Sequence, residues 1–187
     1  MSTTATTIHD RTTSFARVRW FFALAVFPLL IAVGAQVRVP VPGSEVPLTL
    51  QTLFVFLAGG FLGVRASLAA TSIYLALGCF QVPVFAGSIT GFAYLLGPTG
   101  GYLLGFLVAA PLIALLLERV RPQRLVTLAL VLALGSLPVL ACGAVVYHLA
   151  TGANLELTLA RAVVPFLAGD AVKVLAAAGT LRLARTS

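Results

Sequence analysis

The sequence predicts an all-α integral membrane protein with six transmembrane helices and irregular outer loops that form a ligand pocket. Of its 187 residues, 60% are hydrophobic and 9% are charged, and the mean hydropathy is +1.08. Soluble domains carry roughly 25% charged residues, so a bilayer is the expected solvent. Six apolar runs approach the roughly 17–25 residues that a helix needs to cross it. We expect helices over residues 20–37, 48–63, 65–82, 100–117, 125–149 and 157–183.

The positions of the arginines predict the orientation of these spans, because cytoplasmic loops retain Lys and Arg. Six spans place both termini on one side, and most of the arginines fall on that side: Arg11, Arg17, Arg19, Arg65, Arg119, Arg121, Arg124, Arg182 and Arg185. Only Arg38 and Arg161 fall on the other. We therefore expect both termini to be cytoplasmic, with residues 1–19 as a tail and residues 20–187 as one membrane domain. The net charge of +7 then reflects topology and not nucleic-acid binding.

Two connections on the predicted outer side do not read as simple turns. Residues 38–52 contain three prolines, which forbid a continuous helix and favour an extended path. Residues 82–105 carry no charge and are interrupted by prolines and glycines, so this backbone must fold back onto the protein. We interpret the two segments as the roof and wall of a pocket; the alternative is a re-entrant loop that only packs.

Two opposite charges lie in the middle of the last predicted helix. Asp170 and Lys173, the only lysine, are three residues apart and face the same way. Each charge at the centre of a bilayer costs roughly 2.5–3.5 kcal/mol, so such residues usually face the bundle interior and mark a substrate or ion path. A pair that only packs helices, or a Lys that reaches the interface, is the alternative.

A ligand for this pair needs a small polar head with both donors and acceptors. Gln51 and Thr49, at the start of the second predicted helix, add hydrogen-bonding groups, whereas aromatic side chains in or beside the broken loop predict a partly apolar ligand. These aromatic residues are Phe85, Phe92, Tyr94 and Tyr102. The sequence has no phosphate-binding loop, no Cys and His cluster at metal-ligand spacing and no serine with His and acid partners, so we expect no enzyme, metal or cofactor.

Three strings resemble the BioY family, the biotin-binding S components of energy-coupling-factor vitamin transporters. They are AVGAQVRVPVPGSEVPLTLQTL, GCFQVPVFAG followed by LLGPTGGYLLGF, and GDAVK, which together span residues 32–173. The resemblance implies a protein of the prokaryotic plasma membrane that binds biotin from outside. It places the family's acid and lysine at Asp170 and Lys173, its second-helix motif at residues 49–52, including Thr52, and its outer-loop motif at residues 87–94. The loop motif includes Gly87, Gly91, Phe92 and Tyr94.

The resemblance also implies roles and partners. Asp170 would accept from the ureido N–H groups, and Lys173 would donate to the ureido oxygen or orient the carboxylate, while another site receives the tail. A transmembrane coupling protein and two ATP-binding subunits would supply the energy. In the family, small residues four apart on the first helix dock the coupling protein; here Leu29 follows Ala25 at that spacing. The rival interpretation is a stand-alone channel, a proton-linked carrier or an intramembrane enzyme that uses the pair.

Overall fold

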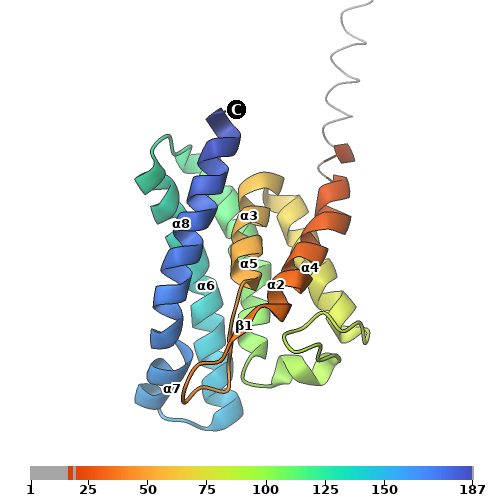
Figure 1. Ribbon diagram of the computed structural model, residues 1–187, viewed down its shortest axis with the longest axis vertical. Helices are drawn as coiled ribbons and strands as arrows, with labels where there is room; N and C mark the ends of the chain where they lie inside the picture. The colour runs from red at the N-terminus through yellow and green to blue at the C-terminus, as the bar shows by residue number, and fades with distance from the viewer. Residues whose placement is uncertain (1–16, 19, 187) are drawn as a thin grey trace, which may run out of the picture.

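The computed structural model describes residues 17, 18 and 20–186 and shows helices packed side by side (Figure 1). Most of the predicted tail, residues 1–19, lies outside the described residues. In chain order the elements are η1 (Phe22–Val26), α2 (Phe27–Gln36), β1 (Arg38–Val39), β2 (Leu48–Thr49), α3 (Gln51–Leu62), α4 (Val64–Cys79), η2 (Phe92–Leu96), α5 (Gly100–Val120), α6 (Leu125–Thr151), α7 (Leu155–Ala162) and α8 (Val164–Thr186). The predicted helical membrane fold is confirmed.

The helices differ in how far they reach across a bilayer. Within the described residues, three are long and apolar enough to cross: Gly100–Val120, Leu125–Thr151 and the stretch Leu155–Arg185. Three shorter apolar helices are Phe22–Gln36, Gln51–Leu62 and Val64–Cys79. At 1.5 Å per residue, the 12 residues of α3 rise about 18 Å, against about 30 Å of hydrocarbon. The second predicted span therefore begins inside the molecule, after β2.

The last predicted span is interrupted, which corrects the expectation of one helix over residues 157–183. Helix α7 ends at Ala162, Val163 leaves the helical conformation with φ −127°, and α8 starts at Val164. Pro165 explains the break because it has no N–H to continue the hydrogen-bond ladder. The hydroxyl of Tyr102 donates to the carbonyl of Ala162 and so satisfies an acceptor at this end.

The two ends of the bundle carry different elements. Element η1 and the start of α2 lie at the end of the bundle where α8 ends. The β1–β2 hairpin, η2 and α7 lie toward the opposite end (Figure 1). The hairpin is antiparallel, with Arg38 opposite Thr49 and Val39 opposite Leu48. The proline-rich connection is thus extended as predicted, although the sequence did not indicate that it pairs with itself.

The irregular segment between α4 and α5 folds back onto the bundle. The ring of Phe85 is fully buried and lies over Gly78 of α4, where an added Cβ would come within 2.1 Å of the ring. The N–H of Gly91 donates to the carbonyl of Gly78 at 2.8 Å. A glycine in the helix therefore gives the returning loop both room and an exposed acceptor.

Glycines also set the distance between α5 and α6. Gly101 and Gly105 are four apart on α5, a spacing that lets two backbones approach closely. A Cβ on Gly101 would lie 2.1 Å from the carbonyl oxygen of Cys142, and one on Gly105 would lie 2.7 Å from the Cα of Val139. Because both obstacles are backbone atoms of α6, any side chain here forces the helices apart.

We expect Gly101→Ala to lower the melting temperature of the detergent-purified protein, since overpacking of this kind costs about 1–3 kcal/mol. The matched control is Gly179→Ala in α8, where nothing lies within 4 Å of the new methyl group. Alanine has the higher helix propensity, so the control should melt at or above the wild-type temperature. Equal melting of the two variants would contradict close α5–α6 packing.

Candidate functional site

An internal cavity lies between the start of α3, the β1–β2 hairpin and α8. It measures about 520 Å³ between its lining atoms, with its opening to solvent included. The lining residues are Val46, Pro47, Thr49, Gln51, Thr52, Ala86, Tyr94, Thr99, Tyr102, Leu103, Phe106, Val139, Leu140, Phe166, Asp170 and Lys173. Most of the wall is therefore apolar, and its polar groups come mainly from α3 and α8.

The charged pair of α8 forms part of this wall. Lys173 Nζ donates to Asp170 Oδ1 at 3.1 Å, and the two residues are 8% and 7% exposed. Ionised Asp170 has further acceptor sites, and Lys173 has two more N–H donors. Among the described residues, Asp170 is the one side chain that accepts a hydrogen bond from Lys173. The pair therefore keeps donors and acceptors that a guest molecule could use.

A hydrogen-bonded chain fixes the orientation of Gln51 at the start of α3. Thr49 Oγ1 donates to Gln51 Oε1 at 2.9 Å, and Gln51 Nε2 donates to the hydroxyl of Tyr74. Tyr74 in turn donates to the carbonyl of Val84 at 3.2 Å. The amide therefore sits beside the cavity in one orientation, linked to both α4 and the irregular segment.

Thr52 carries the one buried side-chain polar atom that lacks a hydrogen-bond partner within the described part of the chain. The residue is 8% exposed and lines the cavity. A buried hydroxyl without a partner costs about 1–3 kcal/mol. A polar group of a bound molecule, or ordered water, would remove this cost.

Aromatic rings build the remaining wall in two layers. Tyr94 lines the cavity and stacks on Phe85, with ring centroids 5.2 Å apart. Phe85 meets Tyr74 edge to face at 5.8 Å. On the other side, Tyr102 and Phe166 both line the cavity, with centroids 5.2 Å apart. Phe85 thus supports the wall from behind and does not face the cavity.

Of the ten residues predicted for the site, six line the cavity: Thr49, Gln51, Thr52, Tyr94, Asp170 and Lys173. The other four do not. Phe92 is 63% exposed on η2, and Phe85 lies in the second layer. Gly87 and Gly91 have positive φ values of 85° and 94°, so they shape the turns of the loop. Gly87 also lies against the Arg38 guanidinium, where a Cβ would come within 2.7 Å.

Several lining residues were not predicted from the sequence. Phe166 precedes Asp170 by four positions and Lys173 by seven, so the three share one face of α8, and this spacing was a usable signal. Val139 and Leu140 of α6 sit in a uniformly apolar helix that offers no such signal. Val46 and Pro47 enter the cavity because the hairpin turns inward before α3, which only the three-dimensional fold reveals.

The cavity is narrow in this conformation. The space open to the centres of water molecules is about 40 Å³. By that measure one water needs about 10–15 Å³, so the cavity holds about three waters. A larger molecule requires the lining to move.

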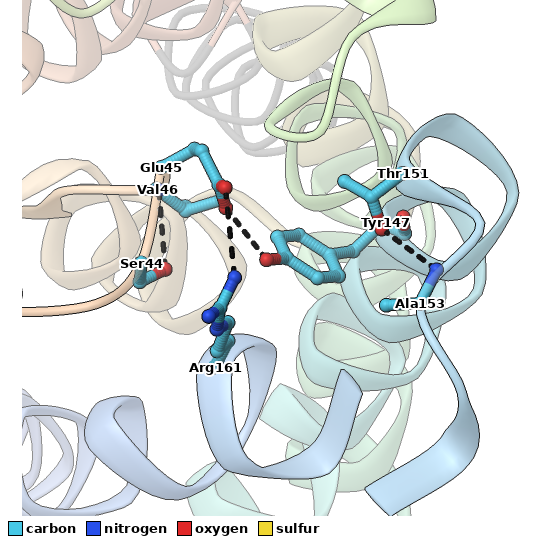
Figure 2. A network of polar contacts seen from close by, with 7 residues as sticks. All are labelled: Ser44, Glu45, Val46, Tyr147, Thr151, Ala153 and Arg161. Atoms are coloured by element: carbon cyan, nitrogen blue, oxygen red, sulfur yellow. Dashed lines mark hydrogen bonds and ion pairs between the residues drawn. The ribbon is translucent and has the colours of Figure 1, made fainter. Parts of the chain in front are cut away.

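A polar clasp holds the hairpin to the end of the bundle. Figure 2 shows Glu45 directed toward Tyr147 of α6 and Arg161 of α7. Tyr147 donates to Glu45 Oε2 at 2.6 Å, and Arg161 Nη1 lies 3.9 Å from Glu45 Oε1. Ser44 Oγ accepts from the N–H of Val46 at 3.2 Å and shapes the turn. Residue 46 lines the cavity, so the clasp acts directly on the roof.

The surroundings of Glu45 in the clasp favour its ionised form. The hydrogen bond from Tyr147 lowers the pKa of the Glu45 carboxyl below its ordinary value of 4.5, with backbone hydrogen bonding and the Arg161 charge acting in the same direction. Glu45 and Arg161 side chains are 55% and 40% exposed, so solvent screens the ion pair and its contribution is small. Of the two polar contacts of Glu45, the charge-assisted hydrogen bond from Tyr147 is therefore the stronger.

Fold and cavity together define a multi-pass helical membrane protein with an internal, largely apolar cavity that is charged at one wall. The model of the BioY family matches residues 5–187. The chain belongs to the BioY family.

Named relatives and a solved structure agree with this membership. The chain is 42% identical over 102 residues to "Biotin transporter BioY" of Thermotoga maritima, covering 54% of this chain and 59% of that one. It is 34% identical over 151 residues to "Biotin transporter BioY2" of Lactococcus lactis subsp. cremoris, covering 78% and 82%. Several alignments, including that to the Thermotoga protein, thus span only about half of the relative's length.

The solved structure is a crystal structure of "the S-component for biotin from an ECF-type ABC transporter". It superposes with a TM-score of 0.85 at 26% identity and covers 91% of this chain and 93% of that one. These relatives are named transporters, and the structural neighbour is a transporter component.

We expect Tyr147→Phe to raise the pKa of Glu45 toward its ordinary value, because the largest cause of its lowering is removed. Since the pKa is lowered in the clasped state, the clasp is complete above pH 4.5 and weakens as the pH falls through the lowered value. In the variant only the ion pair with Arg161 remains, and protonation of Glu45 should disrupt it at a higher pH. Titration of ¹³C-labelled glutamates by NMR measures the shift, with the Glu156 carboxyl as the internal control; an unchanged Glu45 pKa would contradict the clasp.

Proposed function

We propose that this chain is the biotin-binding component of an energy-coupling-factor transporter and that it takes up biotin in the cavity beside Asp170 and Lys173. The observation that carries the proposal is a buried ion pair on a cavity wall that also bears the unpartnered hydroxyl of Thr52. The names of the relatives supply the identity of the ligand, which the cavity alone defines only as small, amphipathic and hydrogen-bonding.

The chemistry of biotin matches the cavity group by group. Its ureido ring has two N–H donors and one carbonyl acceptor, so Asp170 accepts from the ring and Lys173 donates to it. The thioether ring and the aliphatic tail contact the apolar wall around Tyr102 and Phe166. Because Asp170 and Lys173 are one turn apart, the tail carboxylate must reach other groups of the cavity.

Uptake would begin at the hairpin end of the molecule. The positive-inside rule places the arginine-rich end and both termini in the cytoplasm of a prokaryotic cell, so the hairpin faces outward. The sequence contains no phosphate-binding loop, and a transmembrane coupling protein with two ATP-binding subunits would supply the energy. Undiminished uptake of labelled biotin by cells that lack these partners would contradict this part of the proposal.

Calorimetry with biotin and desthiobiotin tests the site. We expect Asp170→Asn and Lys173→Met each to weaken biotin binding by at least about 10-fold, since hydrogen bonds to charged groups contribute about 1.5–3 kcal/mol. Each single change also leaves one buried charge unpaired, which destabilises the fold by about 3–5 kcal/mol. The double variant removes both charges and should regain thermal stability without regaining affinity.

The double variant separates a binding role from a packing role. Wild-type affinity in the folded double variant would show that the pair only packs helices. A pH-dependent ion flux into liposomes that contain this chain alone, together with no biotin binding, would favour an ion path over the proposed function.

Thr52→Val tests the unpartnered hydroxyl. If a ligand atom bonds to it, the variant should bind biotin about 3–10-fold more weakly, at about 0.5–1.5 kcal/mol per neutral hydrogen bond. The ligand-free protein should melt at or above the wild-type temperature, because a buried polar atom without a partner is removed. The matched control is Thr71→Val, whose hydroxyl donates to the Ser67 carbonyl at 3.1 Å and lies outside the cavity lining. Its affinity should not change; equal affinities in both variants would exclude Thr52 from the site.

A further inference from the structure

A second hollow runs along the outside of the bundle between α6 and α8. This groove has a volume of about 1030 Å³, with open space included. Its lining residues are Leu125, Val126, Ala129, Leu130, Ala133, Ser136, Leu137, Leu140, Leu167, Asp170, Ala171, Val174 and Leu175. The α6 residues repeat at spacings of three and four, so they form one continuous face of the helix.

The groove presents almost only hydrocarbon. Its two polar residues have partners inside the protein, since Ser136 Oγ donates to the carbonyl of Ala133 at 2.8 Å and Asp170 accepts from Lys173. Its edges are strongly exposed leucine and valine side chains, with Val126 at 69% and Leu175 at 60%. From Leu125 to Leu140 it extends about 22 Å along α6 at 1.5 Å per residue, against about 15 Å for half of a bilayer's hydrocarbon.

One end of the groove is positively charged. Arg124 directly precedes Leu125, the first lining residue, and Arg121 lies in the turn before it. Arg185 of α8 donates from Nη1 to the carbonyl of Pro122 at 3.2 Å, which brings the end of α8 to the same turn. All three side chains are exposed, and none forms an ion pair with a carboxylate of the described residues.

The helix itself adds to this positive field. Arg124 is the N-cap residue of the 27-residue α6, and no side chain caps the N–H groups of the first turn. Such N–H groups and the helix dipole favour an anion, and the three arginines supply the matching charge. Glu118 is the acid nearest in sequence, but its Oε1 atom lies 3.5 Å from the position of a Cβ on Gly63, at the α3–α4 turn.

We propose that the groove binds an anionic phospholipid, with the phosphate at Arg121, Arg124 and Arg185 and an acyl chain along α6 and α8. Basic pockets beside transmembrane helices bind anionic headgroups, and the groove is long enough for a chain that spans one leaflet. Leu140 and Asp170 line both the groove and the internal cavity. The acyl chain therefore packs against the outer side of the residues that separate the cavity from the bilayer.

The test compares spin-labelled phosphatidylglycerol with spin-labelled phosphatidylcholine for association with the full chain in phosphatidylcholine vesicles. The wild type should prefer phosphatidylglycerol, and Arg124→Gln with Arg185→Gln should lower the preference by about fivefold per arginine. The matched control, Arg17→Gln with Arg65→Gln, makes the same change of charge before η1 and on α4, at residues that do not line the groove, and should keep the preference. Equal association of both lipids with the wild type, or an unchanged preference in the groove variant, would overturn the proposal.

Two measurements need no arginine variant. High salt should reduce the preference of the wild type, because the screening length falls to about 3 Å at 1 M. Phosphatidylglycerol with a photoreactive group on its acyl chain should crosslink to peptides of α6 and α8, and Ala133→Phe should suppress this product by filling the groove. Crosslinking to other parts of the chain, or a product that Ala133→Phe leaves unchanged, would overturn the lipid site.

Discussion

The ion pair between Asp170 and Lys173 is the constraint around which the bundle is arranged. Exposing either charge to lipid is costly, and the two residues are only 7% and 8% exposed, so the face of α8 that bears them is largely covered by the bundle. An apolar interior would be equally unsuitable, since a buried pair recovers its desolvation cost only with further hydrogen-bonding groups. The start of α3 supplies such groups at the same depth, through Gln51 and Thr52. The short length of α3 follows from this requirement, because a full-length helix would place its first turn at the membrane surface.

The same requirement explains the irregular backbone at that depth. Peptide groups outside regular structure are tolerated within a membrane protein only where other protein groups or a cavity satisfy them. Here the β1–β2 pairing, the Gly91–Gly78 hydrogen bond and the Tyr74–Val84 hydrogen bond satisfy groups of both irregular segments. The loops are thus fixed where they meet the helices, and the cavity lies between them.

The sequence predicted those features that depend on residues close together along the chain. The pair three positions apart, the six apolar runs and the proline-rich extended segment are all local patterns; each run contains a helix, although the last run is split into α7 and α8. The break at Val163 also has a local cause in Pro165, which was read as part of one long helix. The clasp could not be predicted, because Glu45 and Tyr147 are 102 positions apart and no local sequence pattern indicates that they are in contact. Phe85 was misplaced for the same reason: only its packing over Gly78 puts it behind Tyr94.

The contacts that hold the different walls of the cavity in place therefore differ in strength. Its α8 wall carries a buried ion pair that is costly to break, and α5 and α6 are held at backbone contact by Gly101 and Gly105. Its roof is held by the packing of Val46 into the core, by one hydrogen bond to Glu45 and by a half-exposed ion pair. Exposed pairs contribute about 0–1 kcal/mol, whereas breaking a buried one costs about 3–5 kcal/mol. The polar contacts that hold Glu45 are therefore weaker than the ion pair in the α8 wall.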